Sequence, residues 1–215
     1  MKRCIALLLV LFTLVLMGCG AETVPKEKSL EVLNPLKGST LEKTHKIEDF
    51  EFITTYNTGK YDLSRWRITD SKVINMTAQV SNLPAGATVL IEHVHVDMSL
   101  KSTNPQLDGL SQDFMDDSYH GSSQDGFFIN NKYPYQNKFA VEGFSKDLIN
   151  GWMFACDSYG AGDISQKRLT EENLVASGKV YANKMQVVYD VLVKYADEDF
   201  YHVVSVLDEF LIPVK

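Results

Sequence analysis

Apolar and polar residues alternate along most of the chain beyond Ile47, and this period of two is typical of half-buried β-strands. The alternation is strictest at 74–80, where every second residue is apolar. Turn-forming residues follow at 82–86, and an acidic turn at 196–199 separates the last two apolar runs. The segments that we expect to form strands are 50–56, 74–80, 88–100, 127–129, 138–141, 185–195 and 200–207.

The run 88–100 is the longest of these predicted strands, and its two faces differ in character. One face is apolar, and we expect it to point into the core: Leu90, Val94, Val96, Met98 and Leu100. The opposite face carries a different set: Ile91, His93, His95, Asp97 and Ser99. Two imidazoles and a carboxylate therefore line one side of a single predicted strand.

Short strands in this number, joined by turns rich in Gly, Pro, Asn and Asp, indicate an antiparallel β-sandwich. The predicted fold class is therefore all-β, and it resembles the immunoglobulin fold in architecture, without the disulfide of antibody domains. One short helix is expected at 166–177, with Gly178 after its end. The expected β-sandwich domain covers 47–215.

The N-terminal segment differs from the rest of the chain and predicts export. Lys2 and Arg3 precede an apolar run at 5–17, which is shorter than the roughly 20 residues that a membrane-spanning helix needs. This is the pattern of a secretory signal peptide. The motif at 16–19, Leu-Met-Gly-Cys, resembles the lipobox of bacterial lipoproteins.

The lipobox resemblance implies that Cys19 is the lipidation site and that residues 1–18 are removed as the signal peptide. Cys19 would carry diacylglycerol on its sulfur and a fatty acid such as palmitate on its new amino group. Two or three acyl chains make the attachment of a protein to a membrane effectively irreversible. The expected location is the extracytoplasmic face of the cell membrane, with membrane lipid as the first partner. Residues 19–46 are mixed in charge and contain Pro25 and Pro35, which predicts a flexible tether.

The charge and the cysteines narrow the classes of protein further. The chain has 21 Lys+Arg against 28 Asp+Glu, and loss of Lys2 and Arg3 with the signal peptide changes the net charge from −7 to −9. Nucleic-acid-binding surfaces are basic, so we expect no nucleic-acid partner. Cys156 is left with no partner for a disulfide in the mature chain, and we expect it to be a small buried residue. An exported protein without disulfides favours a Gram-positive host.

His93, His95 and Asp97 are candidate metal ligands. Alternate residues of a strand lie about 7 Å apart on one face, and imidazoles with a carboxylate suit zinc. A further ligand could come from the loop that follows: Asp116, Asp117 or His120. The alternative, which we favour, is that these residues form the solvent-facing side of a half-buried strand. We therefore expect neither a metal site nor a cofactor.

The segment 111–126 is acidic and rich in turn-forming residues. Such a loop can hold calcium, but the spacing of an EF-hand is absent, and we expect a solvated loop of the type that often carries binding. The chain contains neither a G-x-S-x-G motif nor a glycine-rich phosphate loop. We therefore assign no catalytic residue and expect a protein that is not an enzyme.

Residues 11–18, Leu-Phe-Thr-Leu-Val-Leu-Met-Gly, resemble an enterococcal sex-pheromone octapeptide of the form LFSLVLAG and differ from it at Thr13 and Met17. Pheromones of that family are cut from the signal peptides of surface lipoproteins, and similar peptides occur in TraH-type lipoproteins of Gram-positive conjugative plasmids. The resemblance implies a binding or assembly component of a conjugative transfer apparatus, with another envelope protein as its partner. The alternative function is a solute- or metal-binding lipoprotein that uses the face of His93, His95 and Asp97.

Overall fold

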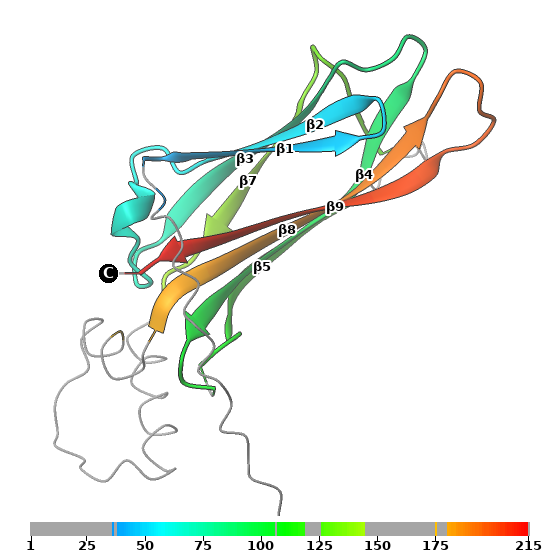
Figure 1. Ribbon diagram of the computed structural model, residues 1–215. Coiled ribbons are helices and arrows are strands. Elements are labelled where there is room, and N and C mark those ends of the chain that lie inside the picture. Colours follow the sequence, from blue (N-terminus) through cyan, green and yellow to red (C-terminus); the bar gives the residue numbers. More distant parts are fainter. Residues whose placement is uncertain are drawn as a thin grey trace, which may run out of the picture. The chain divides into compact units, whose positions relative to one another are not determined.

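Nine strands and one 3-10 turn make up the described part of the chain (Figure 1). The computed structural model describes residues 36, 38–105, 107–118, 126–144, 175 and 180–214, all within a unit that starts at Pro35. In chain order the elements are β1 (Thr40–Ile47), β2 (Phe50–Asn57), η1 (Leu63–Arg65), β3 (Lys72–Ser81), β4 (Thr88–Ser102), β5 (Ser111–Ser118), β6 (Phe127–Ile129), β7 (Tyr135–Val141), β8 (Val180–Lys194) and β9 (His202–Pro213).

The strands form two antiparallel sheets. The first sheet has the order β1-β2-β3-β7, and the second has the order β5-β4-β8-β9, with β6 also paired to β4. The inner faces of the two sheets pack together: the ring of Phe52 on β2 meets Tyr189 on β8 edge to face, with centroids 5.4 Å apart. The molecule is therefore the all-β sandwich that the alternation predicted, and all seven predicted strands occur in it.

In β3 the sequence alternation translates directly into burial. The inward apolar residues of this strand are at most 2% exposed: Ile74, Met76, Ala78 and Val80. The residues between them are half-buried or exposed on the outer face. Burial of apolar surface contributes about 25 cal/mol per Å², so this one-sided pattern fixes the face that β3 turns to the core.

The strand β4 departs from the prediction because it contains a bulge. Its register with β8 shifts between Ile91 and His93. An extra residue at a bulge reverses the faces that strict alternation assigns to the residues on either side of it. Ile91 therefore lies in the core together with Val94, while Leu90 on the other face of β4 is also buried, at 3% exposed. The prediction that Ile91 faces solvent was wrong, whereas Leu90 is buried.

The β-sandwich begins before the expected boundary at residue 47. Strand β1 covers Thr40–Ile47, inside the segment 19–46 that was predicted as a tether, and it pairs with β2 along its whole length. The strand was not predicted because two of its inward positions hold the polar residues Lys43 and His45. The ammonium group of Lys43 lies 4.7 Å from the ring centre of Phe210, so its long side chain packs like an apolar one.

The segment 111–126 also differs from the prediction of a solvated loop. Its first part, Ser111–Ser118, is β5, an edge strand paired with β4. Asp117 on this strand accepts hydrogen bonds from the Tyr135 hydroxyl and the Asn137 amide of β7, both at 2.6 Å. The strand β5 was not predicted because polar side chains such as Asp117 occupy positions that are apolar in a typical half-buried strand. Charged residues on an edge strand also discourage pairing with other chains.

Several predicted features lie outside the described residues: the signal peptide 1–18, Cys19, His120, Cys156 and, apart from Val175, the helix expected at 166–177. The expectations for them stay predictions. Within the described part of the chain, no helix has the length and apolar character that crossing a membrane requires.

Candidate functional site

Two histidines and two aspartates meet on the outer face of the five-stranded sheet. His93 and His95 belong to β4, with Asp116 on the neighbouring β5 and Asp190 on β8 at the other side. Asp116 Oδ1 lies 2.7 Å from His95 Nδ1 and 3.1 Å from His93 Nε2, both within hydrogen-bond distance. His93 Nδ1 is 3.5 Å from Asp190 Oδ2, and Asp190 also accepts a hydrogen bond from Ser205 Oγ of β9 at 2.7 Å. A row of polar groups therefore crosses four strands.

The hydrogen bond from His95 is the main reason why the pKa of Asp116 is lowered, and the hydrogen bond from His93 adds to this effect. Asp97, the predicted third member of the group, lies outside it, because its carboxylate accepts from Ser111 Oγ at 3.4 Å. Asp116, which was predicted as a possible further ligand, contacts both histidines instead. Within the described ranges, no group of three or more His, Cys, Asp or Glu side chains is arranged to hold a metal ion.

A second polar cluster is buried between the two sheets. Asp208 of β9 is fully buried, and its carboxyl oxygens contact three side chains of the first sheet. Oδ1 lies 2.6 Å from His45 Nε2, and Oδ2 accepts from Thr54 Oγ1 and from the Tyr56 hydroxyl, each at 2.5 Å. The Tyr56 hydroxyl is also 3.1 Å from that of Tyr189. These contacts join β9 and β8 to β1 and β2.

Burial is the main reason why the pKa values of Tyr56 and Tyr189 are raised, and the nearby Asp208 carboxyl raises both further. Both hydroxyls therefore stay protonated at neutral pH and can donate hydrogen bonds. Since both oxygens of Asp208 have partners, the cluster serves to hold the sheets together. Sequence reasoning missed it because the predicted strand ended at residue 207, and because an aspartate at an inward position suggests a solvent-facing site.

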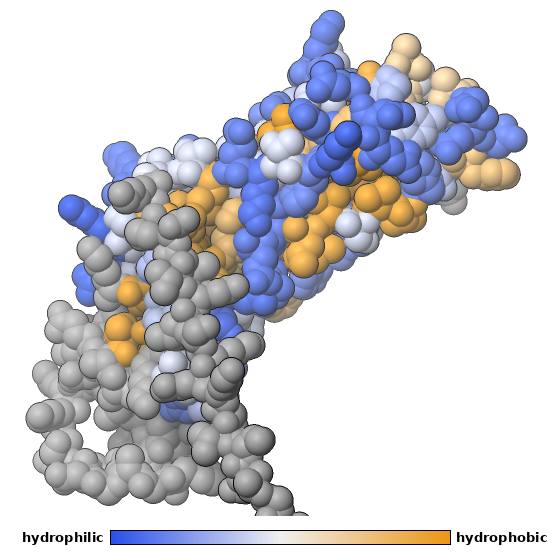
Figure 2. All heavy atoms as spheres, in the orientation of Figure 1, coloured by the Kyte–Doolittle hydropathy of each residue, from blue (hydrophilic) through white to orange (hydrophobic). Residues whose placement is uncertain are grey.

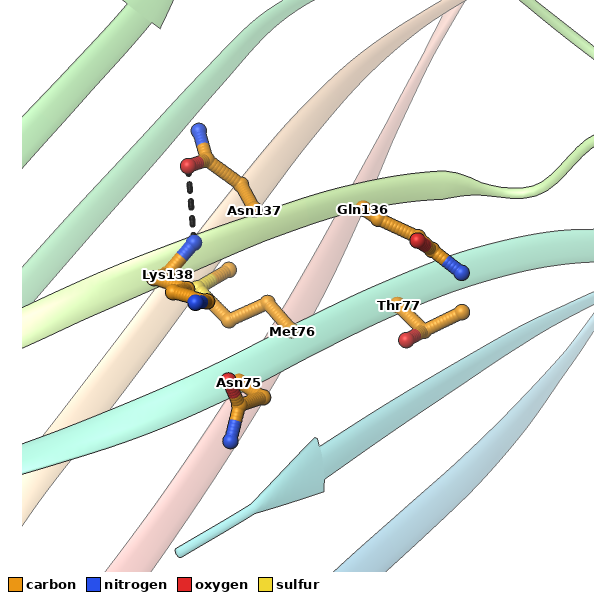
Figure 3. Close-up of a pocket in the computed structure, with 6 residues that line it drawn as sticks. All are labelled: Asn75, Met76, Thr77, Gln136, Asn137 and Lys138. Carbon is orange, nitrogen blue, oxygen red and sulfur yellow. Dashed lines mark hydrogen bonds between the residues drawn. The ribbon is translucent and has the colours of Figure 1, made fainter.

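A surface hollow of about 540 Å³ lies beside β3 and β7 (Figure 3). Its lining is mainly amide and hydroxyl groups: Asn75, Met76, Thr77, Gln136, Asn137 and Lys138. Gln136 and Thr77 extend toward the same side in Figure 3, and Asn137 Oδ1 accepts from the backbone N–H of Lys138 at 2.7 Å. The lining can offer hydrogen bonds to a polar ligand, and sequence reasoning had selected none of these residues.

Comparisons with known proteins add no function to these observations. No protein-family model matches the sequence, and a search of curated proteins found no match. Among solved structures, a protein from Archaeoglobus fulgidus is similar at 11% sequence identity and a TM-score of 0.33, covering 83% of this chain and 98% of that chain. A likeness this distant carries no argument about function.

Proposed function

We propose that this protein is a lipid-anchored binding or assembly component of the extracytoplasmic cell surface and is not an enzyme. The observation that carries the proposal is the motif Leu-Met-Gly-Cys at 16–19, directly after the apolar run 5–17. Acyl chains on Cys19 would attach the chain permanently to the membrane. The β-sandwich supports the proposal because its strands bury their own apolar faces and leave broad outer faces for contact with a partner.

The proposed setting is conjugative transfer in a Gram-positive host. Its support is the resemblance of residues 11–18 to pheromone peptides of the form LFSLVLAG and to the signal peptides of TraH-type lipoproteins. In this setting the partner is another protein of the cell envelope. The acidic net charge of the chain means that acyl chains, and not electrostatic attraction to anionic lipid, hold it at the membrane.

Replacement of the lipidated cysteine tests the anchor. We expect Cys19→Ser in the full-length protein to abolish labelling by a radioactive fatty acid and to prevent cleavage before residue 19. Cys156→Ser is the matched control, because it removes the other cysteine of the mature chain and should leave labelling unchanged. Normal labelling of the Cys19→Ser protein would refute the lipoprotein assignment.

Gene deletion tests the proposed setting separately. If the protein acts in conjugation, deletion should lower the frequency of plasmid transfer, and the wild-type gene should restore it. The Cys19→Ser gene should restore transfer poorly, since its product lacks the anchor. Unchanged transfer after deletion would remove conjugation from the proposal and leave the anchor untouched.

A further inference from the structure

Apolar side chains form a row across one end of the outer face of the five-stranded sheet. The strand register places Leu90 opposite both Phe128 and Leu192, and it places Leu192 opposite Val203. The row therefore crosses β6, β4, β8 and β9. Phe128 is 56% exposed and Val203 is 61% exposed, so the two ends of the row face solvent.

The segment that joins β8 to β9 at this end of the sheet carries two exposed aromatic residues. Phe200 is 82% exposed and is the most exposed of the large apolar residues described, and Tyr201 is 43% exposed. Lys194 lies 5.9 Å from the ring centre of Tyr201 and covers part of it. We call the solvent-accessible set the apical patch, and it consists of Phe128, Leu192, Phe200, Tyr201 and Val203. Figure 2 shows hydrophobic side chains among hydrophilic ones along β9. Exposed apolar surface with a polar border is typical of sites that bind a partner.

The apical patch lies at the end of the sandwich far from the start of the domain. His202 Nε2 lies 3.9 Å from Glu48 Oε1, so the β8–β9 turn adjoins the β1–β2 turn. The chain enters the sandwich at the other end, where the Gly38 carbonyl accepts from the Leu63 N–H. The eight residues of β1 separate these ends by roughly 25 Å. Figure 1 shows both turns at the end away from the C-terminus.

Carboxylates border the apical patch on two sides. The β8–β9 turn contributes Asp197, Glu198 and Asp199, which directly precede Phe200. On the other side, Asp190 and the exposed Glu92 lie next to the apolar row. Two basic side chains also lie there: Lys194 contacts Tyr201, and His202 lies between Glu48 and Glu198, 3.6 Å from the latter. Carboxylates outnumber these basic groups, so the border is acidic on balance.

We propose that the apical patch docks a protein segment that combines apolar side chains with lysine or arginine. The apolar row supplies the area that drives association, and the acidic border selects a basic partner and repels acidic ones. The same border disfavours a second copy of this acidic chain and a membrane of anionic lipid. The docking proposal rests on the apolar row and its acidic border, and it does not depend on the proposed anchor at Cys19.

Site-specific photo-crosslinking tests the proposal in cells that carry the full-length protein. A photoreactive phenylalanine analogue is placed at Phe128 or Phe200, and the matched control is Phe114, which is 65% exposed on β5 of the same sheet. We expect the first two positions to yield adducts with a Lys- or Arg-rich protein segment, identified by mass spectrometry, and Phe114 to yield few. Adducts with lipid or with a second copy, equal adducts at Phe114, or no adducts would each overturn the proposal.

A binding measurement on purified full-length protein in detergent adds a quantitative test. The probe is a short synthetic peptide of leucine and lysine, and its control has glutamate in place of lysine. We expect Phe200→Ser to weaken binding of the lysine peptide about tenfold, and Phe114→Ser to change it less than about twofold. Since both residues are exposed, neither substitution should lower the melting temperature. Equal binding of both peptides, or equal effects of both substitutions, would overturn the proposal, whatever the outcome for Cys19→Ser.

Discussion

At the residue scale, Asp208 links the two sheets most directly. Its fully buried carboxyl group contacts His45, Thr54 and Tyr56 of the opposite sheet. In Asp208→Asn an amide N–H₂ replaces one oxygen and leaves at least one of these donors unpaired in the core. We expect the free energy of unfolding to fall by about 3 kcal/mol, measured by denaturant titration of the full-length protein.

The matched control for Asp208→Asn is Asp190→Asn. Asp190 also accepts a hydrogen bond and lies near a histidine, but its side chain is 32% exposed on the outer face. Water can replace the contacts that Asp190 loses, so the free energy of unfolding should fall by less than about 1 kcal/mol. Equal losses in the two variants would contradict the role of burial in this argument.

The buried tyrosines predict loss of stability at alkaline pH. Burial raises the pKa of Tyr56 and of Tyr189 above the ordinary value of 10.0. The folded chain therefore holds these protons more tightly than the unfolded chain, and stability is complete below pH 10 and declines as the pH rises further. Thermal denaturation should show a melting temperature that falls steeply above about pH 10. In Tyr56→Phe the melting temperature should fall less steeply with rising pH. If it falls as steeply as in the unchanged protein, Tyr56 is not the cause of the alkaline loss of stability.

The outer histidines predict little response to zinc. His93 and His95 already share Asp116 as a hydrogen-bond partner, and Asp97 points its carboxylate to Ser111 instead. A ligand present at 100 times its Kd would stabilise the fold by about 2.7 kcal/mol. We expect no stabilisation of this size when zinc is added and thermal denaturation is followed. A shift of that size, lost in His93→Ala, would support the alternative of a metal-binding lipoprotein.

At the scale of elements, β1 is expected to be essential for stability although it resembles a tether in sequence. It supplies His45 to Asp208 and covers the edge of β2. A fragment starting at residue 47 should melt about 10 °C or more below one starting at 36, since each lost kcal/mol lowers the melting temperature by about 2–4 °C in a domain of this size. Removal of 20–34 alone is the control and should have no effect. Equal melting temperatures for all three proteins would show that β1 is dispensable.

The alternation predicted strands in which most inward residues are apolar. The segment 74–80 of β3 is the clearest case, although the buried Lys72 that starts this strand lay outside the prediction. The alternation failed where an inward side chain is polar and finds a partner on the other sheet, as Lys43 and His45 do in β1 and Asp117 does in β5. Such partners come from distant parts of the chain, so a local pattern does not contain them. The bulge at Ile91 was not predicted either, because only the pairing of β4 with β8 reveals it.

The polar site was predicted in part. The period of a strand correctly placed His93 and His95 on one face, where their ring centroids lie 6.4 Å apart. Their carboxylate partners, Asp116 and Asp190, belong to the strands on either side, and the register between strands selects them over Asp97. Asp208 had no comparable signal, since its importance depends on donors more than 150 positions earlier in the chain.

At the scale of the whole molecule, the chain is predicted to yield two products with separate roles. Signal peptidase cleavage before Cys19 would leave the sandwich anchored and release residues 1–18. One further cut before Leu11 would free the octapeptide 11–18, with Gly18 as its C-terminus. Nearly all its side chains are apolar, so a receptor groove could bind it through the hydrophobic effect, at about 25 cal/mol per Å² buried less the cost of ordering.

We expect mass spectrometry of culture supernatant to detect this octapeptide, and the synthetic peptide to induce clumping or transfer in responsive recipient cells. Thr13 and Met17 differ from the LFSLVLAG form by an added methyl group and a longer side chain, which can overfill a pocket fitted to Ser and Ala. The matched control is therefore the peptide with Thr13→Ser and Met17→Ala, which should act on enterococcal recipients at lower concentration. Absence of the octapeptide from the supernatant would contradict the prediction. An apolar core is common to signal peptides, so the resemblance in sequence is not enough by itself. Release of the peptide with Gly18 as its C-terminus requires both cleavages.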